Sequence, residues 1–226
     1  ADSLLTMSIR ALDYTPPVHL EFGDFLSALL TADHEIRPDD SRYRFRQRLL
    51  KSFKSYGIQP AAKTGGTEEG MWGPQGVGLN YKRTHFEPMT RDYDEVFRFV
   101  WENRQDLRLN PDAYTRVMSV RPCVRVAPDG FMLRETVAEC IQHLKLKASE
   151  LDAMGIDKPS DMPGSMEIEL QGGLTLIFDE YGQVKYNITN SVANRVRQAG
   201  RLRQLWMRHG IGKGAKLYRQ FSYLHR

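Results

Sequence analysis

The stretch "MEIELQGGLTLIFDEYGQVKYNI", residues 166–188, decides the fold. Its apolar and polar residues alternate with a period of two, and the turn signal at Gly182 divides it in the middle. A period of two places alternate side chains on opposite faces of a strand, and a short glycine-containing turn favours antiparallel pairing. The stretch therefore predicts two strands of an antiparallel hairpin.

The same period extends towards the N-terminus. It recurs in residues 114–120, 123–137 and 141–147, which predicts a small, mostly antiparallel sheet. Two helices are expected beside it. One spans about 92–106, with Asp92 and Glu95 at capping-box spacing and an apolar side made of Tyr93, Val96, Phe97, Val100 and Trp101. The other spans about 191–209 and is the last helix expected in the chain, with its apolar residues directed inward: Val192, Val196, Ala199, Leu202 and Trp206.

Three further helices are expected near the N-terminus. Leu5, Ile9 and Leu12 share one helical face, and a second apolar face follows Pro16 and Pro17: Phe22, Phe25, Leu26, Leu29 and Leu30. A third helix starts after Asp39, Asp40 or Ser41, any of which can cap it, and stops at Gly57. Its outer side is basic.

A change of composition divides the chain. Residues 59–80 hold six glycines and little periodicity, which is typical of a linker or a long loop. We therefore expect an α+β protein with a helical segment over 1–58, a glycine-rich linker over 59–91, and an α+β region over 92–226. The last region contains the sheet and a basic C-terminal helix and tail.

Composition restricts the class of protein. The 226 residues are 41% hydrophobic and 27% charged, which is the range of a globular chain, and no apolar run is long enough to span a bilayer. Cys123 and Cys140 are too few for a disulfide framework, although one bridge stays open, and a reducing, cytoplasmic location is expected. No basic and apolar leader follows Ala1, so we expect no secretion signal. Whether the chain is a processed piece of a longer protein stays open.

Positive charge is concentrated in two runs. The net charge is +4, yet residues 41–67 hold seven Lys and Arg, and residues 191–226 hold nine, with no acid in either run. Such runs are common on solvated helix faces and also bind anionic surfaces. The predicted partner-binding residues lie in the second run: Arg195, Arg197, Arg201, Arg203, Arg208, Lys213, Lys216 and Arg219.

Several motifs for chemistry fail. His34 and Glu35 could begin a His-Glu-x-x-His zinc helix, but Pro38 occupies the second histidine position and places the pair at a helix C-terminus. The spacing of Gly73, Gly76 and Gly78 does not fit a dinucleotide loop. No metal-ligand spacing exists among the histidines. We therefore predict no catalytic residue and no metal ligand in this chain, and leave enzymatic activity uncertain.

Two weaker constellations remain. His85, Glu87 and Asp92 lie beside the glycine-rich region and would be our choice for an acid/base site. Cys140 and His143 lie within one strand or turn, whereas a nucleophile and its base usually meet from different elements. A structural role is the stronger interpretation of both.

The N-terminal helices resemble a known family. "IRALDYTPPVHLEFGDFLSALLTADHEI" and the later "FKSYGI" are similar to the final helices of thermolysin-like zinc metallopeptidases, a resemblance covering about a quarter of the chain. The sheet and last helix resemble C-terminal extensions of predicted bacterial members. The matching residues are Arg10, Ala11, Leu12, Tyr14, Pro16, Phe22, Ala28, Ala32, Asp33, Phe53 and Gly57.

The resemblance implies a role without catalysis. In that family the zinc-binding His-Glu-x-x-His helix, the downstream glutamate ligand and the histidine that stabilises the transition state precede this segment, so zinc is expected only in a catalytic half outside this chain. We therefore expect a non-catalytic C-terminal region or separated subunit of a metallopeptidase-like hydrolase, with a protease core in cis or as a separate chain as its partner. The alternative is a basic nucleic-acid-binding module, because the C-terminal run mixes cations with aromatic residues.

Overall fold

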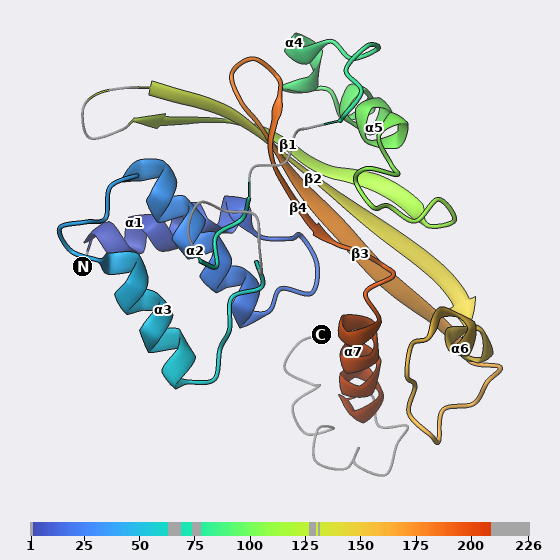
Figure 1. The fold of residues 1–226 in the computed structure, drawn as a ribbon. Coiled ribbons are helices and arrows are strands. Elements are labelled where there is room, and N and C mark those ends of the chain that lie inside the picture. The colour runs from blue at the N-terminus through green and yellow to red at the C-terminus, as the bar shows by residue number, and fades with distance from the viewer. Residues whose placement is uncertain (1, 63–68, 74–77, 127–129, 131, 209–226) are drawn as a thin grey trace.

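The protein is an α+β fold built around one antiparallel sheet (Figure 1). The computed structural model describes residues 2–62, 69–73, 78–126, 130 and 132–208. The four strands are β1 (Tyr114–Val126), β2 (Met132–Lys147), β3 (Glu167–Phe178) and β4 (Val184–Asn190), paired in the order β1-β2-β3-β4. All three pairings are antiparallel, as predicted.

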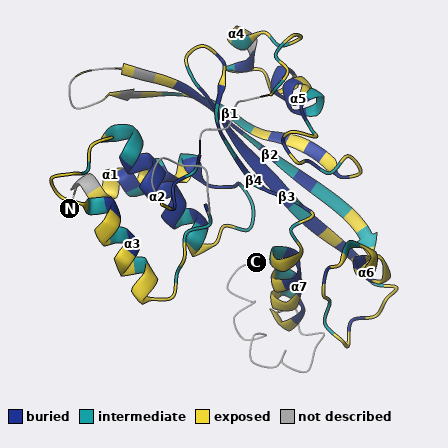
Figure 2. Cartoon of the chain, viewed as in Figure 1, coloured by how far each residue is buried: buried dark blue, intermediate teal, exposed yellow. Residues whose placement is uncertain are grey.

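Helices cover one face of the sheet at the N-terminal end of the chain. They are α1 (Asp2–Ala11), the 3₁₀ turn η1 (Leu12–Tyr14), α2 (Phe22–Ile36) and α3 (Phe45–Ser55). Helix α2 is the central one and is buried around most of its circumference (Figure 2). A shared core joins these helices to the sheet: Ala11, Tyr14, Ala28, Leu29 and Ala32 pack with Val137, Ile177, Tyr186 and Ile188.

The third helix ends as the sequence predicts, but it begins later than predicted, at Phe45 with Arg44 as its N-cap, although Asp40 still caps its first turn. The Asp40 carboxylate accepts hydrogen bonds from the backbone N–H groups of Phe45 and Arg46, at 2.7 and 2.8 Å. After the helix, Gly57 has a φ of +75°. The N–H of Gly57 donates to the carbonyl of Lys54 and that of Ile58 to the carbonyl of Phe53, which is a glycine C-terminal cap.

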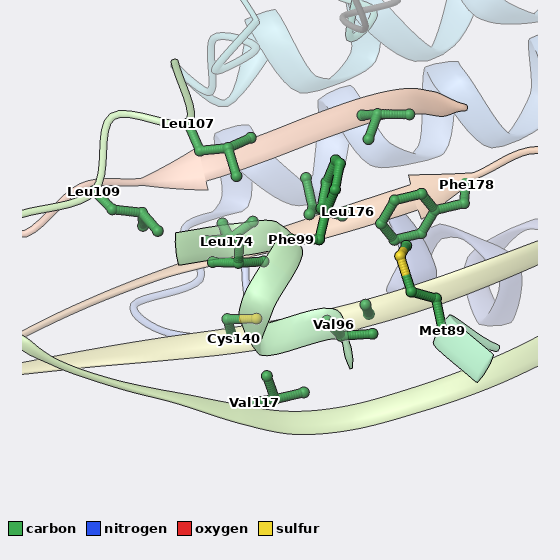
Figure 3. Packing of buried hydrophobic residues seen from close by; sticks show 13 residues of the cluster. Met89, Val96, Phe99, Leu107, Leu109, Val117, Cys140, Leu174, Leu176 and Phe178 are labelled. Carbon is green, nitrogen blue, oxygen red and sulfur yellow. The ribbon is translucent and has the colours of Figure 1, made fainter. Parts of the chain in front are cut away.

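The other face of the sheet carries a second core under α4 (Phe86–Met89) and α5 (Tyr93–Glu102) (Figure 3). Helix α5 directs Val96, Phe99 and Val100 into this core, while Tyr93 and Phe97 are exposed, so the predicted inward side was partly wrong. The short α6 (Leu151–Met154) and α7 (Arg195–Arg208) pack at the far end of the sheet, where α7 closes the fold.

The described part of the glycine-rich region lies against α2. Ala62 donates its N–H to Ser27 Oγ at 3.0 Å, and Trp72 donates its N–H to Thr31 Oγ1 at 3.0 Å. The Trp72 ring also donates through Nε1 to the Tyr14 carbonyl at 2.9 Å. Residues 59–62 and 69–73 are therefore held by the helical layer, and the division into three regions stays a prediction.

Candidate partner-binding surfaces

The basic helix α7 is fixed by its inner side. Ala199, Leu202 and Trp206 are buried among the residues of the α6 end of the sheet. Trp206 donates through Nε1 to Asp161 Oδ1 at 2.8 Å. Gln198 is fully buried and donates to the Gln171 carbonyl on β3 at 2.7 Å. The inward placement of Trp206 is confirmed, whereas Val196, also predicted inward, is 82% exposed.

Two of the predicted partner-binding arginines make contacts inside the molecule. Arg197 pairs with Asp24 of α2 and lies 3.7 Å from a Glu21 oxygen. Burial alone would lower the pKa of Arg197. The hydrogen bonds and charge of Asp24, together with the charge of Glu21, outweigh this effect, so the pKa of Arg197 is raised overall. Arg201 donates to His19 Nδ1 at 2.6 Å and to Gln171 Oε1 at 3.0 Å.

The remaining predicted cations divide into exposed residues and residues outside the described range. Arg195, Arg203 and Arg208 are exposed on α7. The Arg195 side chain lies over Gly155: a Cβ atom added to Gly155 would lie 3.1 Å from the Arg195 guanidinium. Lys213, Lys216 and Arg219 lie outside the described residues. The basic end therefore has three described arginines on its surface and two that link α7 to its neighbours.

A second candidate surface, called the α1 face below, lies over α1 and the start of η1 and is defined by four exposed aliphatic side chains: Leu4, Leu5, Ile9 and Leu12. Each is between 47% and 63% exposed. The buried side of the same helix is formed by Met7 and Ala11, with Tyr14 following. The sequence pattern placed Leu5, Ile9 and Leu12 on one helical face, and the structure leaves all three exposed. Contiguous exposed apolar patches are one mark of interaction sites for proteins, membranes or ligands.

A polar cluster joins α2 to β4 and contains the glutamate of the rejected zinc motif. Glu35 Oε1 accepts a hydrogen bond from the Tyr186 hydroxyl at 2.6 Å, and Glu35 Oε2 pairs with Lys185. Lys185 also pairs with Glu135 Oε1 at 3.1 Å, and the Tyr186 ring meets Tyr14 edge-on at 5.5 Å. The prediction that His34 and Glu35 lie at the end of a helix is confirmed, because α2 ends at Ile36.

A β-bulge creates this cluster. Ile177 pairs with Tyr186 and Phe178 pairs with Val184, so Lys185 is an extra residue in β4. A bulge of this kind breaks the strict alternation of side chains, which allows both Lys185 and Tyr186 to reach Glu35. Lys185 thus lies between the carboxylates of Glu35 and Glu135, and the Tyr186 hydroxyl donates to Glu35. These contacts hold α2 against the sheet. Sequence reasoning missed them because the bulge has no sequence signal.

In the first of the two weaker constellations, Asp92 has a structural role. Asp92 caps α5, and its Oδ1 accepts from the backbone N–H groups of Asp94 and Glu95. His85 contributes its own backbone N–H to Glu95 Oε1 at 3.2 Å, and the side chains of His85 and Glu87 are exposed.

Cys140 and His143 do not form a nucleophile and base. Cys140 is buried in the core below α5, and burial, with the charge of Glu139, raises the pKa of its thiol to about 12. His143 instead contacts Glu169 Oε1 through Nδ1, at 2.7 Å. A thiol with so high a pKa is almost entirely protonated near neutral pH and is a weak nucleophile.

Comparison with known proteins gives no relative: no family model matches the chain, and no curated protein and no solved structure is similar to it. None of the helices in the described ranges combines the length and the apolar character that crossing a membrane requires. In the same ranges, no three His, Cys, Asp or Glu side chains are grouped so that they could hold a metal ion.

Proposed function

We propose that this chain is a non-catalytic region or separated subunit of a zinc metallopeptidase-like protein, and that it docks on a protease core supplied by other sequence. The observation that carries the proposal is the apolar α1 face. Leu4, Leu5, Ile9 and Leu12 are exposed at the start of the segment that resembles the end of such a peptidase domain, and Ile9 and Leu12 lie within the matching stretch. Covering them with another protein surface would remove apolar area from water, which stabilises association.

The residues behind the resemblance also support a scaffolding role. Ala11, Tyr14, Ala28, Ala32 and Asp33 are all buried. Asp33 pairs with the buried Arg46 at 2.9 Å, and Arg46 donates further to the carbonyls of Arg37 and Pro38. These contacts hold the helices and the loop after α2 in place. Zinc chemistry would belong to the partner, and this chain would position or regulate that core.

Nucleic-acid binding is the second candidate, favoured by the exposed arginines of α7. Phosphate contacts are made by cations, and each contact contributes to the salt dependence of binding. Arg197 and Arg201 are engaged inside the molecule, which leaves three described arginines, Arg195, Arg203 and Arg208, on this helix surface. We rank this function below docking on a protease core.

The test is binding to the polypeptide that carries a His-Glu-x-x-His helix in the same reading frame or in a neighbouring gene. The unmodified chain should bind it, and a Leu5→Glu, Ile9→Glu double variant should bind at least about tenfold more weakly, because two charges would be buried in an apolar contact. Tyr181→Glu is the matched control, since Tyr181 is 76% exposed on the β3–β4 turn.

Three results would contradict the proposal. One is stoichiometric, tightly held zinc in the purified chain, which would place metal chemistry here. Another is equal binding by the double variant and the unmodified chain, with both shown to be folded by circular dichroism. A reading frame and gene neighbourhood without any His-Glu-x-x-His polypeptide would also remove the protease core as partner.

A further inference from the structure

The outer face of α7 carries a narrow apolar strip that no part of the described fold covers. Val196, Gly200, Arg203 and Met207 follow at intervals of four, three and four residues, which places them on one side of a helix. Val196 is 82% exposed and Met207 is 43% exposed. We call these four residues the outer strip of α7. It lies to one side of the buried Ala199, Leu202 and Trp206 face, and its two apolar members are exposed, so packing among the described residues does not account for them.

Gly200 is the unusual member of the strip. Glycine inside a helix is less stable than alanine by roughly 1 kcal/mol. No atom lies within 4 Å of the position that a Cβ on Gly200 would take, so the fold itself does not require glycine there. Because the missing side chain lowers the helix surface between Val196 and Met207, the backbone of another element can approach closely at this point.

The charges that α7 itself carries are all positive. Arg203 is part of it, Arg208 follows in the last turn, and both are exposed. Arg195 is exposed at the start of the helix. Residues 191–226 contain no acid, so a second copy of this helix would bring like charges together. A partner that satisfies both features needs carboxylates beside an apolar seam.

We propose that the outer strip of α7 binds an acidic amphipathic helix of a protein partner. Small or aliphatic side chains of that helix pack on Val196, Gly200 and Met207, and its carboxylates face Arg203 and Arg208. This inference rests on the proposed docking function and names the chemistry of a contact distinct from the α1 face. Nucleic acid fits the strip less well, because burying Val196 and Met207 against a phosphate backbone gains nothing from their apolar surface.

The probe is a synthetic amphipathic helix with a Leu and Ala seam flanked by Glu, titrated into the full chain and followed by NMR and calorimetry. We expect the shifted resonances to lie on the outer strip. Arg203→Glu and Gly200→Leu should each weaken binding about tenfold or more, through charge repulsion and through steric exclusion. Gly200→Leu should remain folded, because the site is open and leucine favours helix more than glycine does.

Matched controls separate charge from shape. Arg48→Glu on α3 changes the net charge equally at another exposed position and should leave affinity within about twofold. A peptide with Lys in place of Glu should not bind. No binding of the Glu peptide at millimolar concentration would overturn the inference, as would shifts outside α7. Tighter binding of duplex DNA than of the peptide, unaffected by Gly200→Leu and steeply salt-dependent, would overturn it in favour of nucleic acid.

The two proposals can fail separately. Loss of core binding in the Leu5→Glu, Ile9→Glu variant, with no binding of the acidic peptide, would support the proposed function and overturn this inference. Peptide binding at the outer strip, with core binding unchanged in the Leu5→Glu, Ile9→Glu variant, would support this inference and contradict the proposed function.

Discussion

Arg197 of α7 and Asp24 of α2, 173 positions apart in the chain, are joined by two hydrogen bonds. Arg197 Nη1 donates to Asp24 Oδ2 at 2.8 Å, and Nη2 donates to Oδ1 at 2.7 Å. Asp24 also accepts the backbone N–H of Glu21 at 2.9 Å, which closes the first turn of α2. The basic closing helix is thus held by the N-terminal helical layer through a planar two-point contact, the geometry that arginine provides and lysine does not.

Replacement of Arg197 should therefore destabilise the fold strongly. The Asp24 side chain is 3% exposed, so Arg197→Ala leaves a buried carboxylate without its main partner. We expect a loss of about 3 kcal/mol or more in the free energy of unfolding. Arg197→Lys should lose less stability than Arg197→Ala, because lysine keeps the positive charge. It should still lose some, because lysine cannot make the second hydrogen bond. Urea unfolding measures both, with the exposed Arg203→Ala as control, expected within about 0.5 kcal/mol of the parent. A similar loss for Arg203→Ala would contradict the distinction.

The Glu35 cluster should make stability fall at alkaline pH. Burial and the neighbouring Glu35 charge raise the pKa of Tyr186 far above its ordinary value of about 10. Burial lowers the pKa of Lys185, but Glu35 and Glu135 raise it more, so its pKa is also raised. Above about pH 10 the unfolded chain releases protons that the folded chain keeps, so the free energy of unfolding decreases as pH rises.

Tyr186→Phe tests this directly. The variant removes the hydroxyl that contacts Glu35, and should lose about 1 kcal/mol near neutral pH, where a buried hydrogen bond is lost. It should also show a shallower decline between pH 9 and about 11, since one of the two groups with a raised pKa is absent. Chemical unfolding at several pH values measures both effects. Tyr56→Phe on the exposed end of α3 is the control and should follow the parent.

Local patterns predicted the elements, while contacts between distant residues could not be predicted. The period-two segments became β1 to β4, and Asp40 and Gly57 bound α3 as expected, because capping and alternation depend on near neighbours. Helical periodicity identified the apolar face formed by Leu5, Ile9 and Leu12, but it could not show that the fold leaves this face exposed. Likewise, Arg197 and Arg201 look the same in sequence as Arg203, and only the fold brings Asp24 and His19 to the first two.

Proteolysis should cut first within residues 61–80, but not at Met71 or Trp72. Met71 is buried, and Trp72 is held by two hydrogen bonds to the helical layer, so a protease should not cut there first. Glycine-rich sequence on both sides favours cleavage. We expect the first cut between Ala61 and Asn80, outside residues 70–72, and mass spectrometry of a brief digest identifies it. A first cut within 92–106 or 192–206 would contradict the assigned boundaries.

His19 connects the link before α2 to α7 in a form that requires a neutral ring. Its φ is +53°, and its Nδ1 accepts a hydrogen bond from Arg201, which places the ring proton on Nε2. Burial, with the charges of Arg201 and Arg197, lowers the pKa of His19 to about 4. In the unfolded chain the same ring has a pKa near 6.5.

Acid should therefore weaken the fold through His19. Between about pH 6.5 and 4 the unfolded chain takes up a proton that the folded chain does not, so the free energy of unfolding falls as pH falls. His19→Asn keeps a residue that tolerates positive φ and removes the titrating ring. The variant should be less stable than the parent at pH 7, and its stability should decline less from pH 7 to 4.5. His85→Asn, at an exposed histidine, should keep the parent's decline. Parallel acid curves for His19→Asn and the parent, measured by urea unfolding, would show that His19 is not the group responsible.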